Sequence, residues 1–259
     1  MNQSSAVAVV TGGASGIGAA CCRELARLGY RVAVADIDEA AAARVAAEFG
    51  GTAFAVDVAF EASAEDLAER VERALGPVDV LVNSAGVIQV PLSPETLPMD
   101  SWDQVVRVDQ RGTYVACLVF GRRMAMRGRG AIVNIASVAG MRSMPLHAYA
   151  PAKAAVISMT ECLAAEWGRS GVRVNAVSPG YTRTPALQAA IDRGQRDVRA
   201  LENNSALGRM VEPEEIAKAV AFLAGSDAAA ITGANLPVDA GWLVATPWIT
   251  YQGLPAKRT

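Results

Sequence analysis

The sequence has few aromatic residues and a single histidine. Phe, Trp and Tyr make up 5% of the 259 residues, and 24 Lys and Arg residues are nearly balanced by 26 Asp and Glu residues. Proteins that bind nucleic acid usually carry a basic patch, and a net charge of −2 gives no such indication. We therefore expect no nucleic-acid partner.

Long apolar runs are also absent. The run at 6–10 is far too short to cross a bilayer, and no Lys or Arg precedes Arg23, so we predict neither a signal peptide nor a membrane segment. The four cysteines lie in apolar helical patterns and show neither Cys-x-x-Cys nor Cys/His spacing; they are Cys21, Cys22, Cys117 and Cys162. We expect buried reduced thiols, no metal site and a cytoplasmic location.

Hydrophobic residues, mostly Ala and Val, make up 52% of the chain, and their pattern alternates between two kinds of segment. Short β-branched runs predict strands at 6–10, 31–35, 52–56, 78–82, 131–136, 172–177 and 235–238. Ala-rich amphipathic stretches predict helices at 17–28, 39–49, 64–74, 99–127, 148–169 and 214–224. This alternation predicts an α/β fold, a single-domain Rossmann-type doubly wound parallel sheet with helices on both faces.

A glycine-rich turn follows the first predicted strand and leads into a helix. It reads Thr-Gly-Gly-Ala-Ser-Gly-Ile-Gly at 11–18, which is Gly-x-x-x-Gly-x-Gly and differs from the common Gly-x-Gly-x-x-Gly fingerprint. Glycines let the backbone approach a pyrophosphate, and a helix N-terminus offers free N–H groups to an anion. We predict cofactor contacts from Gly12, Ser15, Gly16, Ile17 and Gly18.

An acidic residue, Asp36, ends the second predicted strand, eighteen residues after Gly18. A carboxylate there can accept hydrogen bonds from both adenosine ribose hydroxyls and would repel a 2′-phosphate. Neither position 15 nor the residue after Asp36 is Arg or Lys. The sequence therefore favours NAD over NADP as the cofactor, with an ordinary helix cap as the alternative role of Asp36.

Two later strand ends supply further expected cofactor contacts. Asp57 and Val58 end the third predicted strand, where they are expected to hold the adenine. Asn83, Ala85 and Gly86 follow the fourth, where small residues admit the cofactor.

Tyr149 and Lys153 are four residues apart, so they share one face of a helix. A tyrosine ordinarily loses its proton near pH ~10. A neighbouring ammonium lowers that pKa, which makes the phenol usable as an acid or base near neutrality. Ser137, twelve residues before the tyrosine, could hold the oxygen that gains or loses the proton.

Taken in order, these motifs resemble those of the short-chain dehydrogenase/reductase family. The resemblance covers 11–241 and adds Asn-Ser-Ala-Gly at 83–86, Pro-Gly at 179–180, Leu-Gly-Arg at 207–209 and Glu-Pro-Glu-Glu-Ile at 212–216. It implies a nicotinamide-dependent enzyme acting on CH–OH groups, usually a homotetramer or dimer whose contacts involve the helices at 99–127 and 148–169.

The resemblance also implies residue roles. Tyr149 would be the general acid/base on the substrate oxygen, Lys153 would lower its pKa and hold the nicotinamide ribose, and Ser137 would orient the substrate oxygen. The carboxamide end of the cofactor would contact Pro179, Gly180, Thr182 and Thr184.

Asp109 departs from the family pattern, because the family usually has asparagine there. That asparagine is associated with a helix distortion and a water-linked proton path to the active-site lysine. An aspartate has nearly the same shape but brings a negative charge towards Lys153, which would raise the pKa of Tyr149. Two readings stay open: a catalytic residue that shifts the pH optimum upwards, or an acceptor oxygen that serves equally well.

Residues near the crevice mouth bear on the substrate. His147 and Tyr181, with Ser137 and Tyr149, are the expected substrate contacts, although His147 could equally be a surface residue at the start of a helix. Further candidates near the crevice mouth are Met141, Arg142, Met144, Gln89 and Val90. This mixture of polar and apolar groups is consistent with a secondary alcohol, such as a sugar or polyol, and its ketone.

Two segments lie outside the regular alternation. Residues 181–211 have no clean period and predict a lid over the ligand crevice, with a plain surface insertion as the alternative. The tail at 242–259 is aromatic and apolar, so we expect it at a subunit contact or folded onto its own chain. No linker divides the chain, so 1–259 is predicted to be one dinucleotide-binding and catalytic domain.

The leading hypothesis is an NAD-dependent oxidoreductase that interconverts a secondary alcohol and its ketone, with Tyr149 as acid/base. A reductase of 3-oxoacyl thioesters is one alternative, although it usually accompanies NADP, which Asp36 disfavours. A non-catalytic NAD-binding sensor is the other.

Overall fold

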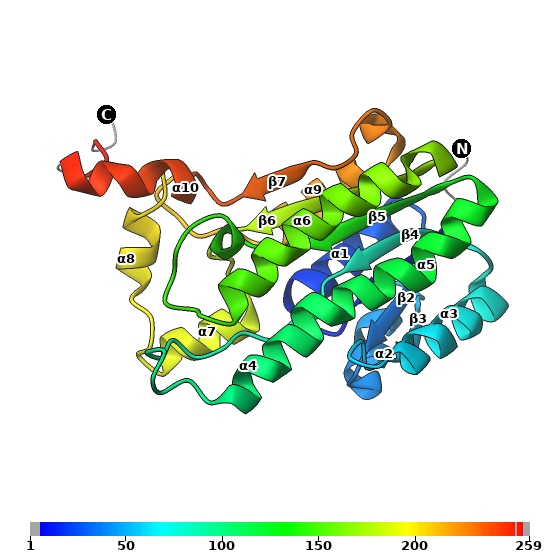
Figure 1. The fold of residues 1–259 in the computed structure, drawn as a ribbon, viewed down its shortest axis with the longest axis horizontal. Helices are drawn as coiled ribbons and strands as arrows, with labels where there is room; N and C mark the ends of the chain where they lie inside the picture. The colour runs from blue at the N-terminus through cyan, green and yellow to red at the C-terminus, as the bar shows by residue number, and fades with distance from the viewer. Residues whose placement is uncertain (1–5, 252, 256–259) are drawn as a thin grey trace.

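A computed structural model describes residues 6–251 and 253–255 and contains one parallel sheet with the strand order β3-β2-β1-β4-β5-β6-β7 (Figure 1). The strands are β1 Val7–Thr11, β2 Arg31–Asp36, β3 Thr52–Ala55, β4 Val78–Asn83, β5 Gly130–Ile135, β6 Val172–Pro179 and β7 Asn235–Val238. Each lies within two residues of its predicted bounds. The predicted α/β fold class is confirmed.

Helices cover both faces of the sheet, because alternate strand residues point to opposite sides. One core packs α1 (Gly16–Arg27), α2 (Glu39–Ala47) and α9 (Pro213–Ala224) against residues such as Val10 and Val34. The other packs α3 (Glu61–Leu75), α5 (Thr113–Arg127) and α6 (Tyr149–Trp167) against their neighbours in sequence, such as Val9 and Ala33. This double burial explains the continuous apolar strands.

The predicted helix at 99–127 is interrupted. The chain forms α4 (Met99–Val105), then a π-helical stretch at Val106–Gly112, then α5. Asp109 lies in this stretch, and the Thr113 hydroxyl donates to the Asp109 carbonyl at 2.7 Å. A single regular helix was therefore the wrong prediction, since the π-helical turn shifts the helix register where Asp109 approaches the site.

The irregular segment at 181–211 contains two short helices that the sequence pattern did not reveal, α7 (Pro185–Asp192) and α8 (Val198–Asn203). Its ends meet: Thr182 and Val211 form a β-bridge, and Val211 exchanges backbone hydrogen bonds of 2.8 and 2.9 Å with Arg183 and Tyr181. The excursion therefore begins and ends at one point on the sheet edge.

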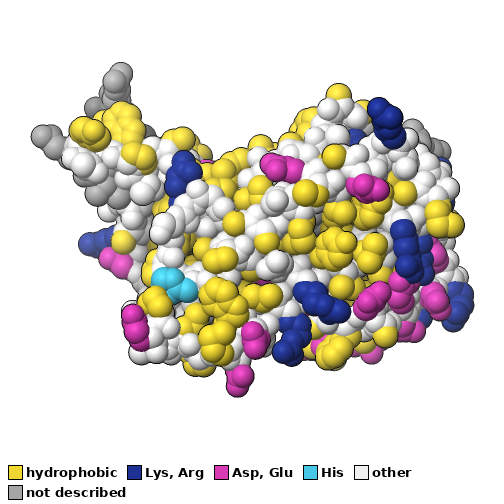
Figure 2. Space-filling model, in the orientation of Figure 1, with side chains coloured by type: hydrophobic (Ala, Val, Ile, Leu, Met, Phe, Trp, Pro, Cys, Tyr) yellow, Lys and Arg dark blue, Asp and Glu magenta, His cyan; other side chains and the backbone are white. Residues whose placement is uncertain are grey.

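The tail begins with α10 (Trp242–Ala245) and a 3₁₀ turn at Thr246–Tyr251, and it projects from one corner of the molecule (Figures 1 and 2). The Trp242 ring meets the Tyr181 ring edge-on, with centroids 5.9 Å apart, so the first turn packs on its own chain. Further along, Trp248 and Tyr251 are 50% and 79% exposed. Residues 252 and 256–259 of the predicted tail lie outside the described residues.

Three cysteines are buried as expected, but Cys162 is exposed on α6, so that part of the prediction was wrong. Burial raises the pKa of Cys21 and of Cys117 to about 12, which keeps both thiols protonated. None of the helices that the structure describes has both the length and the apolar character needed to cross a membrane.

Arg173 on β6 joins the sheet to the end of α9. Its guanidinium donates to the carbonyls of Leu223 at 2.6 Å, Ala224 at 3.1 Å and Gly225 at 3.0 Å. These are carbonyls that a helix C-terminus leaves without partners, and a cation there is favourable. We expect Arg173→Met to lower the free energy of unfolding by about 2–4 kcal/mol, measured by urea denaturation.

The matched control is Arg129→Met. Arg129 pairs with Asp79 at 3.1 Å but is 57% exposed, so its loss should cost less than about 1 kcal/mol. Equal losses in the two variants would contradict a specific role for Arg173.

Candidate active site

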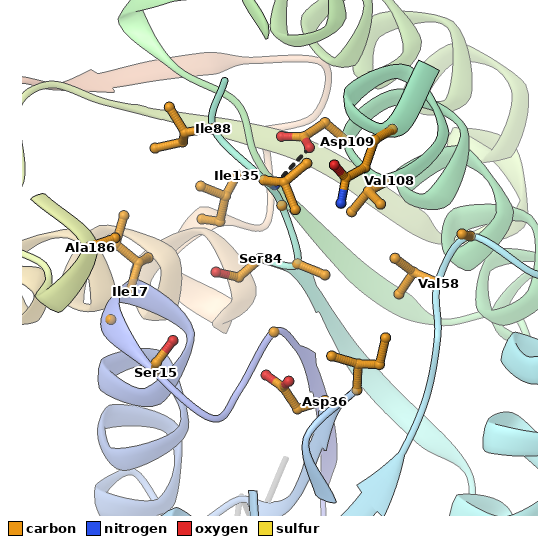
Figure 3. Close-up of a pocket in the computed structure, with 18 of the residues that line it drawn as sticks. Ser15, Ile17, Asp36, Val58, Ser84, Ile88, Val108, Asp109, Ile135 and Ala186 are labelled. Carbon is orange, nitrogen blue, oxygen red and sulfur yellow. Dashed lines mark hydrogen bonds between the residues drawn. The ribbon is translucent and has the colours of Figure 1, made fainter. Parts of the chain in front are cut away.

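A cleft of about 610 Å³ opens at the carboxyl ends of β1 and β4, where the strand order reverses (Figure 3). Ligands of doubly wound sheets bind at such a switch point. Most of the predicted site residues line this cleft: Gly12, Ser15, Gly16, Ile17, Asp36, Asp57, Val58, Ala85, Gly86, Asp109, Tyr149, Lys153 and Thr184.

The glycine turn packs tightly against the strand end after β4. Gly12 has φ +67°, and a Cβ there would stand 2.6 Å from the Ala85 backbone. A Cβ on Gly18 would stand 2.0 Å from the Gly12 carbonyl oxygen, so Gly18 supports the turn from within α1. Ser15 occupies the N-cap of α1 without a side-chain cap hydrogen bond. The first turn of α1 is thus left open to an anion.

The Asp36 carboxylate is fixed at the lower end of the cleft (Figure 3). It accepts hydrogen bonds from the backbone N–H of Ala14 at 3.0 Å and of Asp38 at 3.1 Å. The cap of α2 is Asp38, which accepts from the Ala41 N–H at 2.9 Å. Asp36 is therefore not the helix cap, which removes that alternative.

At the opposite end of the cleft, Tyr149 and Lys153 lie one helical turn apart at the start of α6. The Lys153 ammonium is 5.5 Å from the centroid of the Tyr149 ring and donates to the Ile135 carbonyl at 3.0 Å. Asp109 Oδ2 lies 3.2 Å from Lys153 Nζ, and Asp109 Oδ1 accepts from the Val87 N–H at 2.8 Å (Figure 3). A buried ion pair thus stands beside the phenol.

This environment shifts both pKa values. Burial raises the pKa of Tyr149; Lys153 lowers it, Asp109 raises it and the Ser137 hydroxyl lowers it, with a net rise. Burial lowers the pKa of Lys153, but Asp109 and Tyr149 together raise it by more than burial lowers it. The pKa of Lys153 therefore lies above its usual value. Lys153 therefore stays an ammonium, while Asp109 offsets part of its effect on Tyr149.

Two predicted site residues, Ser137 and Asn83, are not among the residues that line the cleft. The Ser137 hydroxyl, 9% exposed, accepts from the Ala139 N–H at 3.1 Å and caps a short 3₁₀ turn after β5. The buried Asn83 amide donates to Asn134 on β5 at 2.9 Å. Asn83 thus ties the end of β4 to β5.

The remaining predicted residues lie outside the set that lines the cleft. Pro179 ends β6, and Gly180 accepts at 3.0 Å from the hydroxyl of the buried Thr182. The Tyr181 ring packs against the Trp242 ring of the tail. His147 lines a separate hollow of about 400 Å³ beside α6, with Met141 and Met144 among its neighbours.

Residues 12–243 match the family model described as enoyl-(acyl carrier protein) reductase. The chain belongs to the short-chain dehydrogenase/reductase family. Members of this family are oxidoreductases, and this short-chain dehydrogenase/reductase acts on CH–OH groups with a nicotinamide dinucleotide.

Two curated relatives of this short-chain dehydrogenase/reductase are named for polyols. D-threitol dehydrogenase of Mycolicibacterium smegmatis is 42% identical over 92% of this chain and 93% of its own length. Galactitol 2-dehydrogenase (L-tagatose-forming) of Cereibacter sphaeroides is 41% identical over 92% of this chain and 95% of its own.

Two solved structures share the fold of this chain, but their descriptions name different kinds of protein. A crystal structure described as ribose-5-phosphate isomerase from Brucella melitensis 16M is 55% identical, with a TM-score of 0.96 over 98% of both chains. A structure of ElxO with NADP bound is 28% identical, with a TM-score of 0.88 over 93% of this chain and 99% of its own.

Several residues of this short-chain dehydrogenase/reductase line the cleft without having been singled out from the sequence. Ile37 and Phe60, 73% and 58% exposed, line the cleft from the chain after β2 and β3, and their position after predicted strand ends was an available signal. Gln104 and Arg107 come from α4 and the π-helical stretch. The sequence did not reveal them, because the π-helical turn decides which side chains face the cleft.

Proposed function

We propose that the chain is an NAD-dependent dehydrogenase that oxidises a secondary alcohol group of a polyol or sugar to a ketone. The observation that carries this proposal is the Lys153 ammonium beside the half-buried Tyr149 ring, in one cleft with the glycine turn and Asp36. The polyol dehydrogenases among the relatives favour this substrate class.

The cleft suits a dinucleotide, because Gly12 lets the turn pack closely against the Ala85 backbone and the α1 N-terminus is open to the cleft. When bound, NAD⁺ would accept a hydride from the carbinol carbon. Tyr149 would take the hydroxyl proton, with Lys153 stabilising the phenolate. Ser137 would hold the substrate oxygen in line with Tyr149.

NAD is proposed over NADP because of charge at the ribose end. The Asp36 carboxylate would accept hydrogen bonds from ribose hydroxyls and repel a phosphate. Among the described residues that line the cleft, the cations are Arg107 and Lys153, and Lys153 is already paired with Asp109. The bound NADP of ElxO makes a direct comparison of both cofactors necessary.

The proposal extends to two outer segments. Thr184, Pro185 and Ala186 line the cleft at the start of the 181–211 excursion, which supports its role as a lid. The exposed apolar tail and the long helices α5 and α6 support a homotetramer or dimer.

The test is a substrate panel. We expect NADH formation with D-threitol, galactitol or related polyols, and slower NADPH formation. Separate reactions offer ribose 5-phosphate without nicotinamide cofactor, and an acetoacetyl thioester with NADPH. Ketose phosphate in the first, or faster turnover in the second, would overturn the proposal. NADH binding without any turnover would instead support a sensor.

Replacing Asp109 by Asn should move the pH profile of alcohol oxidation to lower pH. Oxidation needs the deprotonated phenol, so activity rises as pH passes the pKa of Tyr149. The Asp109 carboxylate is one cause that raises this pKa, and Asn removes the charge while keeping the shape. The measurement is kcat against pH in both proteins, and superimposable profiles would rule out an electrostatic role for Asp109.

A further inference from the structure

Helix α6, which carries Tyr149 and Lys153, begins without a capping side chain of its own. Its N-cap residue is Ala148, and no side-chain cap hydrogen bond comes from that position. The first turn of any helix leaves N–H groups without intrahelical acceptors, and Ser, Thr, Asp or Asn usually satisfies one of them. Alanine has no oxygen with which to do so.

The missing acceptor is the side chain of Gln89, in the loop after β4. Its Oε1 accepts from the N–H groups of Ala148 at 2.5 Å and Tyr149 at 3.1 Å. The next two residues need no side-chain acceptor. The Ala150 N–H donates to the Leu146 carbonyl at 2.9 Å, and Pro151 has no N–H. One oxygen from about 60 residues away thus completes the start of the helix.

The orientation of this amide is fixed by its partners. Both groups that face Oε1 are donors, so turning the amide over would place N–H against N–H. The Gln89 side chain is buried, with 6% of the residue exposed, and its Nε2 has no partner among the described residues. An unpaired buried donor is unfavourable, so the two hydrogen bonds to α6 must offset it.

We propose that Gln89 is a positioning residue for Tyr149. Lys153 has its own side-chain contacts, the Ile135 carbonyl and Asp109, whereas Tyr149 lies at the first helical position, where an uncapped helix frays. Gln89 Oε1 holds that first position and so fixes the phenol relative to the lysine. This inference rests on the proposed dehydrogenase function for its effect on rate.

The first measurement does not depend on activity. Hydrogen–deuterium exchange is followed in peptides covering 146–153 in the native protein, in Gln89→Leu and in Gln89→Glu. Leu removes the acceptor, so amide protection at the start of α6 should fall. Glu keeps an acceptor oxygen of the same reach and should retain protection. Unchanged protection in Gln89→Leu would overturn the proposal even if the protein has no turnover.

The second measurement is steady-state kinetics with the best substrate of the panel. Gln89→Leu should lower kcat by about 10- to 100-fold, because a displaced acid/base misses the reacting oxygen, while the KM for NAD⁺ changes little. Gln89→Glu, assayed at its own pH optimum, should recover most of kcat. A lowered Tm with unchanged kcat in Gln89→Leu would show a purely structural role.

The matched control is Glu215→Ala, which removes the reciprocal cap at the start of α9, outside the cleft. It should lower stability and leave kcat unchanged. Similar kcat losses in Glu215→Ala and Gln89→Leu would contradict a specific effect on Tyr149.

Discussion

Replacing Tyr149 by Phe is expected to lower kcat about 10³-fold, because proton transfer by a positioned side chain contributes about 10²–10⁴-fold. The substitution removes only the hydroxyl, so the ring that lies 5.5 Å from Lys153 Nζ remains in place. Affinity for NADH, measured by fluorescence titration, should change little. Turnover is measured with the best polyol of the panel.

Tyr114→Phe is the control for this variant. Tyr114 is 44% exposed on α5, and the same loss of a hydroxyl there should leave kcat unchanged. If Tyr149→Phe keeps native turnover, the acid/base is a different group and the assignment fails. If it loses NADH binding as well, the tyrosine serves mainly to hold the cofactor.

Replacing Asp36 by Asn should shift the preference for NAD⁺ over NADP⁺, as a ratio of kcat/KM values, about 100-fold towards NADP⁺. A hydrogen bond to a charged group contributes about 1.5–3 kcal/mol, and its weakening to the ribose hydroxyls should cost NAD⁺ roughly tenfold. Removing the negative charge relieves repulsion of the 2′-phosphate and should raise kcat/KM for NADP⁺ by a similar factor. Both kcat/KM values are measured with one alcohol.

The isosteric change keeps one acceptor oxygen, whereas the N–H groups of Ala14 and Asp38 bond to different oxygens of Asp36, so one of the two hydrogen bonds is lost. Urea denaturation of the variant separates this loss of stability from the change in cofactor ratio. Asp66→Asn is the control, since Asp66 is an exposed partner of Arg70 on α3. An unchanged cofactor ratio in Asp36→Asn would mean that charge at the end of β2 does not select the cofactor.

Most of the sheet could be predicted, because burial on both faces makes the central strands rich in β-branched apolar residues, as in β1, whose five residues are all buried. The glycine turn, Asp36 and the Tyr149–Lys153 pair could also be placed, since their spacing is local. Each of these features depends on residues that are close in sequence, or on the fact that the carboxyl ends of parallel strands meet at one edge of the sheet.

The features that could not be predicted depend on distant pairings or belong to short elements. The resemblance implied a helix distortion near Asp109, but the π-helical stretch at Val106–Gly112, which sets which neighbouring residues face the cleft, was seen only in the structure. Helices α7 and α8 are too short to show a period. The bond from Gln89 to the start of α6 joins segments about 60 residues apart, so only the folded chain reveals it.

The β-bridge between Thr182 and Val211 has a consequence for how substrate range can change. Because the bridge holds the two ends of the excursion side by side, a change of length between them should leave the positions of these ends unchanged. Doubling the length of a flexible loop costs only about 0.6 kcal/mol in closure entropy. We therefore expect that the segment can be lengthened or shortened at a small cost in stability while the sheet and the Tyr149–Lys153 pair keep their positions.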